Sequence, residues 1–244
     1  MQWVVGDVHG MLAEFESVIA QIEEKDSEAS IYCVGDFCDR GYNSKGVVDL
    51  ILSKSNIKCV RGNHDDVFDC ILSGKPTKYS DDQTYEAPLS SLSWFLQFGM
   101  WETLGSYGME RDVIRDSMRS LSSLAALMQK IPVEHHEFYK NLPLMFHGDG
   151  FFVAHATVVP ECNLDDILEY DTHRKAMIWG RYTKAQVDQP KAWGKTGYFG
   201  HTPTKHYGSK NVVFGDECVL CDTGSFFSKK ISAVCHETKE VITS

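Results

Sequence analysis

A strand, a polar loop and a helix follow one another three times in the first third of the chain, and few folds are compatible with this repetition. Short apolar runs occupy residues 2–5, 31–34 and 57–60, and helical periodicity follows at 12–24, at 44–52 and again after 65. Such alternation is typical of a parallel sheet whose strands are joined by crossover helices. Ser44 is the expected N-cap of the second helix. Because the carboxyl ends of parallel strands meet at one sheet edge, the three polar loops should converge there.

The rest of the chain changes its period twice. A polar loop at 74–88 precedes helical periodicities near 91–104, 111–128 and 133–141, which predict a helical insertion that covers the sheet edge. We interpret the loop as a solvated connection in preference to a mobile lid. Short apolar runs between residues 151 and 236 then predict a second, mostly antiparallel sheet. Two sheets packed face to face would form an α/β sandwich flanked by helices.

Charge and hydropathy exclude several classes of protein. A net charge of -10 argues against a nucleic-acid partner, which would require a basic surface. No apolar run approaches the roughly 20 residues that span a bilayer, and the chain starts directly with Gln2–Val5. We therefore expect a cytoplasmic protein without a membrane segment.

The eight cysteines are interpreted as reduced residues of the core, because several lie inside apolar runs, namely Cys33, Cys59, Cys70 and Cys235. Cys218 and Cys221 form a CxxC motif without the further ligands that a structural zinc site needs. Cys38 lies in the central polar loop, where it is either a small packing residue or an oxidisable thiol.

Six side chains in these loops, or directly after later apolar runs, form a candidate ligand set. They are Asp7, His9, Asp36, Asn63, His155 and His201. Two carboxylates, one amide oxygen and three imidazoles suit manganese, iron or zinc better than calcium. Six ligands exceed the need of one tetrahedral ion, so we expect two ions about 3.5–4 Å apart with a bridging carboxylate and a bridging hydroxide as nucleophile.

Other polar residues of the same loops suit phosphate chemistry. His64 can protonate the departing oxygen, and Asp39 can orient His64 and raise its pKa. Arg40 can form bidentate bonds with a phosphate group.

Several remaining residues are interpreted as structural. Arg61 is expected to form an ion pair, His135 and His136 are expected at the surface, and Trp94 and Trp101 are expected in the core.

The polar loops together resemble the motifs of the calcineurin-like metallophosphoesterase superfamily. The matching segments are Gly6-Asp7-Val8-His9-Gly10, Gly35-Asp36 with Asp39-Arg40-Gly41, and Gly62-Asn63-His64-Asp65. Within the superfamily, the sequence is similar to serine/threonine phosphoprotein phosphatases of the bacterial and phage type. The resemblance continues through Asn141-Leu142-Pro143, Val153-Ala154-His155-Ala156, Ile178-Trp179-Gly180-Arg181, Gly200-His201-Thr202-Pro203 and Asp222-Thr223-Gly224.

The resemblance implies a fold and a set of roles. It implies one catalytic domain over residues 1–244, a central β-sandwich of two mixed sheets flanked by helices, with a helical insertion at about 66–150. It places Asp7, His9 and Asp36 on one metal ion, with Asp36 bridging to a second ion on Asn63, His155 and His201. It makes His64 the general acid with Asp39 behind it. It assigns the substrate phosphate to Arg40, Arg181, Asn63 and His64.

The expected function is hydrolysis of phosphoserine or phosphothreonine in a protein or peptide, including dual-specificity action, by a monomer that carries two Mn²⁺ ions. One alternative is a symmetrical diadenosine tetraphosphate hydrolase. Asp65 follows His64 where protein phosphatases commonly carry glutamate, whereas aspartate is common in those hydrolases. Asp39 and Arg40 match the protein phosphatases better. Tyr42 and Thr157 also depart from the family pattern, which often has proline and glycine there. A second alternative, a non-catalytic scaffold, is disfavoured because all six ligands and the acid are present.

Overall fold

The structure, a computed structural model, describes residues 1–80 and 87–244, so part of the expected loop at 74–88 lies outside the described residues. Two five-stranded sheets are present in these residues. The first has the order β10-β9-β1-β2-β3, with β1 (Gln2–Val5), β2 (Ser30–Cys33), β3 (Ile57–Cys59), β9 (Ser232–Cys235) and β10 (Val241–Thr243). The second has the order β4-β5-β6-β8-β7, with β4 (Met145–His147), β5 (Phe151–Ala154), β6 (Thr196–Phe199), β7 (Val213–Phe214) and β8 (Cys218–Leu220).

The three repeated units form the parallel part of the first sheet, as predicted. β2 pairs in parallel with both β1 and β3. The helices α1 (Leu12–Lys25), α2 (Ser44–Leu52) and α3 (Asn63–Ser73) follow these strands in turn. The N-cap of α2 is Asn43 and not Ser44, because the Asn43 side-chain oxygen accepts the N–H of Gly46 at 2.9 Å. Asparagine and serine are equally good caps, so local preference could not choose between these neighbours.

The second sheet is mixed, and the expectation that it is mostly antiparallel was wrong. β6 pairs in parallel with β5 and β8, whereas β4 and β7 pair antiparallel at the two edges. The segment between β5 and β6 contains α9 (Asp171–Trp179) and α10 (Lys184–Asp188), which gives the long crossover that parallel strands need. The last two strands, β9 and β10, join the first sheet: β9 pairs antiparallel with β1.

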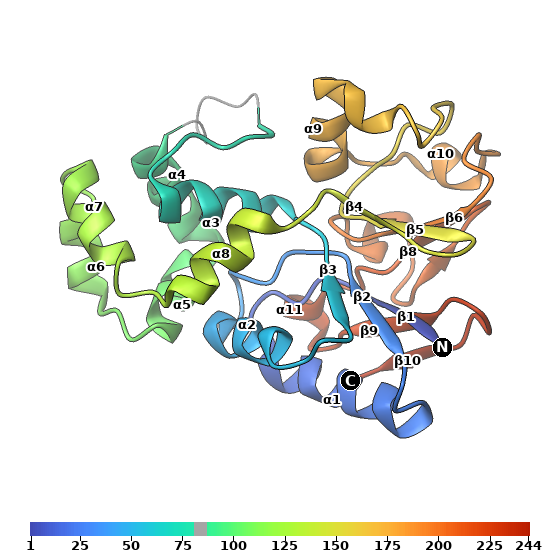
Figure 1. The fold of residues 1–244 in the computed structure, drawn as a ribbon, viewed down its shortest axis with the longest axis horizontal. Coiled ribbons are helices and arrows are strands. Elements are labelled where there is room, and N and C mark those ends of the chain that lie inside the picture. The colour runs from blue at the N-terminus through green and yellow to red at the C-terminus, as the bar shows by residue number, and fades with distance from the viewer. Residues whose placement is uncertain (81–86) are drawn as a thin grey trace.

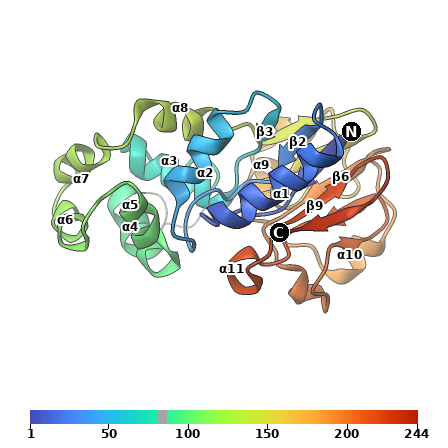
Figure 2. The same cartoon turned by 90° about the horizontal axis from the view of Figure 1, so that it is seen from below.

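Side chains that alternate along each strand build three apolar layers. In β1, Trp3 and Val5 point to the layer that α1 and α2 cover, while Val4 points to the layer between the two sheets. Phe151 and Val153 of β5 fill this middle layer from the other side, and Phe152 faces away from it. Figures 1 and 2 show the result, with α1 and α2 outside the first sheet and α9 and α10 outside the second.

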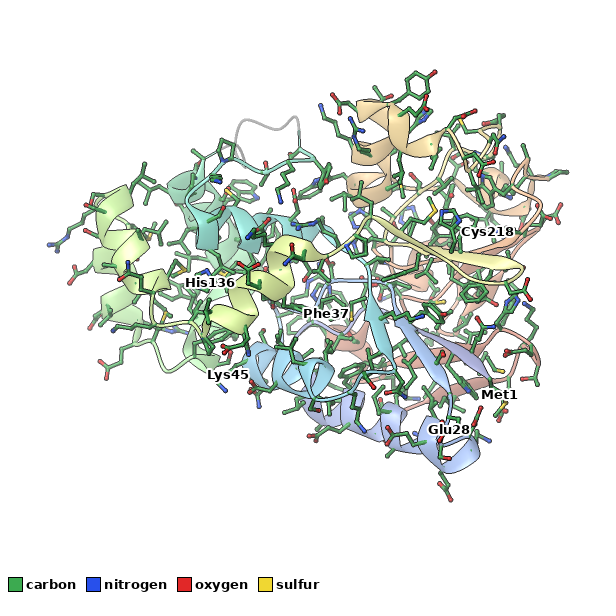
Figure 3. The ribbon with its side chains drawn as sticks, in the orientation of Figure 1. Met1, Glu28, Phe37, Lys45, His136 and Cys218 are labelled. Carbon is green, nitrogen blue, oxygen red and sulfur yellow. The ribbon has the colours of Figure 1, made fainter. Side chains whose placement is uncertain are left out.

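The helical insertion lies at one side of the sandwich (Figure 1). It comprises α4 (Pro88–Phe95), the 3-10 helix η2 (Leu96–Phe98), α5 (Met100–Ser106), α6 (Arg111–Ser117), α7 (Leu121–Met128) and α8 (Val133–Asn141). The expected helix at 133–141 is confirmed. The two longer ones are each broken, at Gly99 with φ +110° and at Ser120, whose side chain caps α7. Phe37 lies where sandwich and insertion meet (Figure 3), with its ring 5.5 Å from that of Phe138.

Arg61 is structural, as predicted, and fastens α8 to α3. Its guanidinium is buried and lies 3.1 Å from carboxylate oxygens of both Asp66 and Asp69. It also donates to the backbone oxygen of Leu142 at 3.3 Å. A buried charge requires such complete pairing, because an unpaired one would lose its hydration without compensation.

Two of the other structural predictions need correction. His135 is buried, and its ring nitrogens lie 2.8 Å from the hydroxyl of Tyr107 and 3.1 Å from Asp49 of α2. Neighbouring helix positions differ by about 100°, so His135 can face inward while His136 stays partly exposed. Trp94 is 41% exposed because Leu92 and Phe95 take the inward positions of α4, whereas Trp101 is partly buried.

The cysteines are free thiols, and those expected in the core at positions 33, 59, 70 and 235 are buried. Burial also raises the pKa of the Cys38 thiol well above its ordinary value, which suits a packing residue. Among the described residues, no helix combines the length and the apolar character required to cross a membrane.

Candidate metal centre

The site is built from loops whose backbone is strained. His9, Asp36, Asp39, Arg40 and His201 all have positive φ, between +47° and +67°. Non-glycine residues avoid this region, at a cost of roughly 1–3 kcal/mol each, unless the surrounding structure enforces it. Five such residues in three loops around one point indicate that the fold holds these side chains in place against local preference.

The loops of Asp36 and Asn63 approach each other closely because the contact residue is glycine. A Cβ on Gly62 would lie 2.1 Å from the Oδ1 atom of Asp36, which no side chain could tolerate. Asp65 then ties the two loops together: its carboxylate accepts the backbone N–H groups of Asp36, Phe37 and Gly62 at 2.7, 2.9 and 2.9 Å. This positioning role of Asp65 was missed in the sequence, although a carboxylate at the third residue of a helix is a recognisable capping signal.

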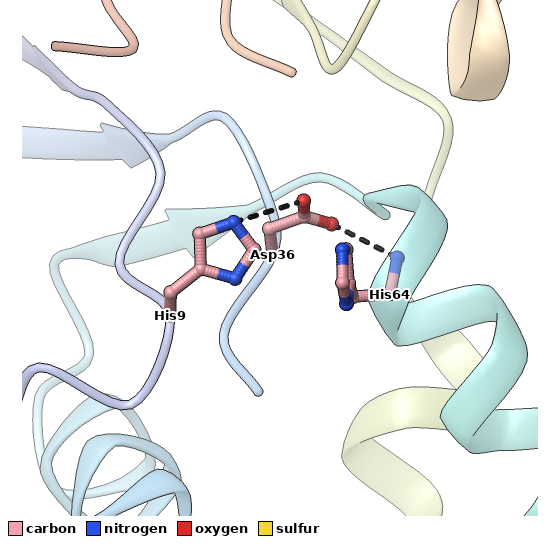
Figure 4. A group of neighbouring side chains, drawn as sticks. All are labelled: His9, Asp36 and His64. Carbon is pink, nitrogen blue, oxygen red and sulfur yellow. Dashed lines mark hydrogen bonds and ion pairs between the residues drawn. The ribbon is translucent and has the colours of Figure 1, made fainter. Parts of the chain in front are cut away.

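His9 presents an unpaired nitrogen to two carboxylates. Its Nδ1–H donates to the backbone oxygen of Cys38 at 3.0 Å, so Nε2 is the free atom. That atom is buried, has no hydrogen-bond partner among the described residues, and lies 3.4 Å from Asp36 Oδ2 and 3.9 Å from Asp7 Oδ2. Figure 4 shows His9 and the backbone N–H of His64 on opposite oxygens of the Asp36 carboxylate. Burial lowers the pKa of His9 well below its usual value, which keeps the ring neutral.

The second group of ligand candidates lies around the Asn63 side-chain oxygen. His155 donates through Nδ1 to the Val34 oxygen at 2.8 Å, and its Nε2 lies 3.1 Å from Asn63 Oδ1. The Nδ1 atom of His201 is 2.9 Å from the same Asn63 oxygen. Since His155 Nε2 is also 3.5 Å from Asp36 Oδ1, the Asp36 carboxylate lies between the two groups. Burial lowers the pKa of His155 to about 4.

These donors fit divalent cations. Asp7, Asp36 and Asp222 are all buried. Burial raises the pKa of Asp7 well above its ordinary value, and the negative charges of Asp222 and Asp36 raise it further. Neutral imidazoles with free nitrogens beside crowded carboxylates leave a negative region that a cation would neutralise. The backbone hydrogen bonds of His9 and His155 fix the ring tautomers, as is typical of metal-binding histidines.

A separate group of side chains surrounds His64. Its Nδ1 lies 2.7 Å from Asp39 Oδ2, and its Nε2 lies 3.3 Å from the Nη2 atom of Arg40. Thr103 of α5 holds Asp39 in turn: its hydroxyl donates to Asp39 Oδ1 at 2.9 Å and accepts the Asp39 N–H at 2.7 Å. The role of Thr103 was missed because no local pattern links it to Asp39, 64 residues earlier.

Burial acts on both members of the Asp39–His64 pair. It raises the pKa of Asp39 to about 8 and lowers that of His64 to about 3, because each charged form loses its hydration. Burial therefore favours the neutral form of both groups, which a short hydrogen bond joins, so the pKa of His64 is lowered and not raised as the sequence led us to expect.

Arg181 lies at the rim. Its side chain is exposed, and it donates to the hydroxyl of Thr202 at 3.1 Å, beside His201. Its charge contributes to the low pKa of His201, after burial and the neighbouring His155. The structure thus brings together all predicted ligand candidates with Asp39, Arg40 and His64, and it places Arg181 at the edge of this group. Asp222 adds a buried carboxylate to which the sequence had assigned no role, and in the part of the chain that the structure describes its Oδ2 atom has no hydrogen-bond partner.

Comparison with known proteins gives concordant matches. The family model described as Calcineurin-like phosphoesterase matches residues 2–235. Serine/threonine-protein phosphatase 1 of Salmonella typhimurium is 25% identical over 228 residues, which cover 89% of each chain. The symmetrical Bis(5'-nucleosyl)-tetraphosphatase of Pectobacterium atrosepticum is 36% identical over 64 residues, only 26% of this chain and 23% of that relative. The structure of a metallophosphoesterase from Sphaerobacter thermophilus covers 99% of this chain and 86% of its own, with a TM-score of 0.52 and 15% identity.

Proposed function

The chain belongs to the calcineurin-like phosphoesterase family, and from this premise we propose that it is a metal-dependent phosphatase of phosphoserine and phosphothreonine in proteins. The observation that carries the proposal is the hydrogen-bonded Asp39–His64 pair directly beside the shared ligand Asp36, whose Oδ1 accepts the His64 backbone N–H at 3.0 Å. The Asp36 carboxylate thus belongs to the candidate metal centre and also fixes the backbone of the candidate acid.

In this proposal Asp7, His9 and Asp36 would hold one divalent ion, and Asn63, His155 and His201, together with Asp36, would hold a second. Such ions, when bound, neutralise phosphate charge and make water a stronger nucleophile at neutral pH. We propose Mn²⁺ as the native ion, with iron and zinc as the alternatives to compare.

The protein's own residues then orient the ester and move the proton. Arg40 and Arg181 bind the phosphate oxygens, and Asn63 lies against the same group. The hydrogen-bonded Asp39–His64 pair holds the proton, which passes to the departing oxygen from His64 Nε2, the ring nitrogen that faces away from Asp39. Asp39 fixes the ring orientation through Nδ1.

The protein substrate is supported by the extent of the match to the Salmonella phosphatase, which covers 89% of both chains. The 64-residue match to the tetraphosphatase, together with Asp65, favours a second candidate, hydrolysis of dinucleoside tetraphosphates. We propose that the phosphorylated partner is a cytoplasmic protein and that the enzyme acts as a monomer.

The deciding experiment compares substrates on one metal-defined preparation. Protein stripped with a chelator and refilled with Mn²⁺ is given a phosphoserine peptide, a phosphotyrosine peptide and diadenosine tetraphosphate at equal concentrations, with Asp36→Asn as the matched control. Faster release of phosphate from the phosphoserine peptide supports the proposal. Faster cleavage of the dinucleotide overturns the substrate assignment. No metal-dependent activity on any substrate overturns the enzymatic function and favours a scaffold.

A further inference from the structure

A groove of about 530 Å³ lies beside the Asp36 loop and has no part in the roles assigned so far. Three segments that are distant in sequence line it. The Asp36 loop contributes Arg40 and Tyr42, the insertion contributes Phe98 and Trp101, and α11 (Ser225–Ser228) contributes Phe226 and Phe227. Its volume lies in the range of small-ligand sites, and half of its lining residues are aromatic.

The aromatic rings of this groove are unusually exposed. Tyr42 is 74% exposed, Phe227 75% and Phe98 41%. Three large rings from three segments on one surface differ from the single exposed apolar residues that are common on proteins. Rigid aromatic side chains around a pocket are the typical anchors of a recognition surface.

The groove shares Arg40 with the candidate phosphate site. Arg40 is one of its walls and also lies 3.3 Å from His64 Nε2. Gly99, between η2 and α5, packs its backbone on the same loop: a Cβ there would lie 1.9 Å from the Arg40 nitrogen. Any group bonded to a phosphate that Arg40 holds could therefore extend along the aromatic wall.

We propose that this groove, which is named here the aromatic groove, binds a bulky apolar side chain of the phosphoprotein substrate close to the phosphorylated residue. This inference rests on the proposed function. A peptide places side chains about 3.3 Å apart along its length, so a residue near the phosphorylated one can enter the groove while the phosphate meets Arg40. The aromatic walls would remove its apolar surface from water.

The lining of the groove favours an apolar peptide side chain over a dinucleotide. Of the described residues that line the groove, Arg40 is the cation and Glu102 is an anion. The nearby ammonium of Lys229 lies over the rings of Tyr42 and Phe226, at 5.8 and 5.4 Å. Glu102 in turn lies 3.9 Å from Arg111, so charges of both signs border the groove, while its exposed rings match an apolar side chain and not a chain of four phosphates.

The test uses phosphoserine peptides with an alanine background in which one leucine is moved from three residues before to three residues after the phosphoserine. The Mn²⁺-loaded protein should favour at least one leucine position by about tenfold in kcat/KM over the peptide without leucine. The double variant Phe98→Ala with Phe227→Ala should reduce this preference to less than about threefold. Phe214→Ala, on β7 and outside the groove, is the matched control because Phe214 is also exposed, at 47%, and it should retain the preference.

The outcomes separate this inference from the proposed function. Equal hydrolysis of all phosphopeptides by the wild type, or an unchanged preference in the folded double variant, overturns the aromatic groove as a peptide site while the phosphatase stands. Hydrolysis of diadenosine tetraphosphate without hydrolysis of any phosphopeptide overturns both. Thermal melts of each variant establish that the comparison is made between folded proteins.

Discussion

The sandwich and the helical insertion reach the same site in different ways. Every ligand candidate lies within four residues of a strand end: Asp7 and His9 after β1, Asp36 after β2, Asn63 after β3, His155 after β5 and His201 after β6. The insertion contributes no ligand candidate. It reaches the site through Thr103, which holds Asp39, and through Phe95, whose ring meets the His64 ring edge-on at 5.1 Å.

The difference suggests a division of work between the two regions. Strand ends fix the ligand side chains through the sheet, because a short strained loop leaves them little freedom. The insertion shares the apolar core of the first sheet and meets the Asp36 loop through Thr103 and the backbone of Gly99, so it shapes the environment of the acid and the aromatic groove without supplying a ligand candidate.

The largest effect is expected at the sandwich, from Asp36→Asn. The amide keeps the shape and can accept the His64 N–H, but it removes the negative charge between the two ligand groups. We expect phosphate release to fall by at least about 10³-fold and the bound Mn²⁺ to decrease. Metal content by elemental analysis, alongside turnover of a phosphoserine peptide, checks this. Full activity with full metal content would show that the ligand groups do not need this carboxylate.

The next effect is expected from His64→Ala, which removes the candidate acid and leaves the ligand set intact. Turnover should fall by roughly 10² to 10⁴ on substrates with poor leaving groups, and less on p-nitrophenyl phosphate, whose leaving group needs no proton. Metal content should stay at the wild-type value. If the variant instead loses its metal, His64 is a metal ligand, and the assignment of His64 as the acid is wrong.

The same division explains what could be predicted from sequence. The repeated units of the first sheet and the ligand candidates follow from short local patterns, so residues 1–65 were assigned with their loops in the correct place. The return of β9 and β10 to the first sheet was missed, because a short apolar run does not identify the strand with which it pairs.

The insertion was predicted to be helical, but the breaks in its helices and its contacts with the sandwich were not predicted. Thr103 on Asp39 and Tyr107 on His135 are tertiary contacts between helices whose relative positions no local pattern gives. The sequence did not predict that His135 faces inward, for the same reason. The candidate acid pair was nevertheless predictable, since Asp39 and His64 both lie in sandwich loops.

Thr103→Val measures how much the insertion contributes to the chemistry. Valine keeps the shape and removes the hydroxyl that donates to Asp39 Oδ1 at 2.9 Å. We expect about a tenfold decrease in kcat on poor leaving groups, which corresponds to the loss of one buried hydrogen bond. Thr103→Ser, which retains the hydroxyl, should stay within about threefold of the wild type.

A merely structural role would give a different result. Loss of stability alone would lower activity on good and poor leaving groups equally and would lower Tm in both variants. A leaving-group dependence confined to Thr103→Val identifies Thr103 as a positioning residue for the acid. Equal activity of valine and serine variants would show that the insertion does not act through Asp39.

The smallest effect concerns the attachment of the insertion to α2 through His135. Burial lowers the pKa of His135, while Asp49 and Glu134 raise it and Lys45 lowers it, and Tyr107 completes its contacts. Because the folded pKa lies below the unfolded value, the unfolded state binds the proton first as the pH falls. The contribution of His135 to stability is therefore present above about pH 6.5 and is lost progressively below it.

Between pH 7 and pH 5, Tm of the wild type should fall by about 1–3 °C more than Tm of His135→Gln. If Tm falls equally with pH in the two proteins, His135 does not make the attachment of the insertion depend on pH. The sandwich and the insertion would then differ only in what they contribute to the candidate site.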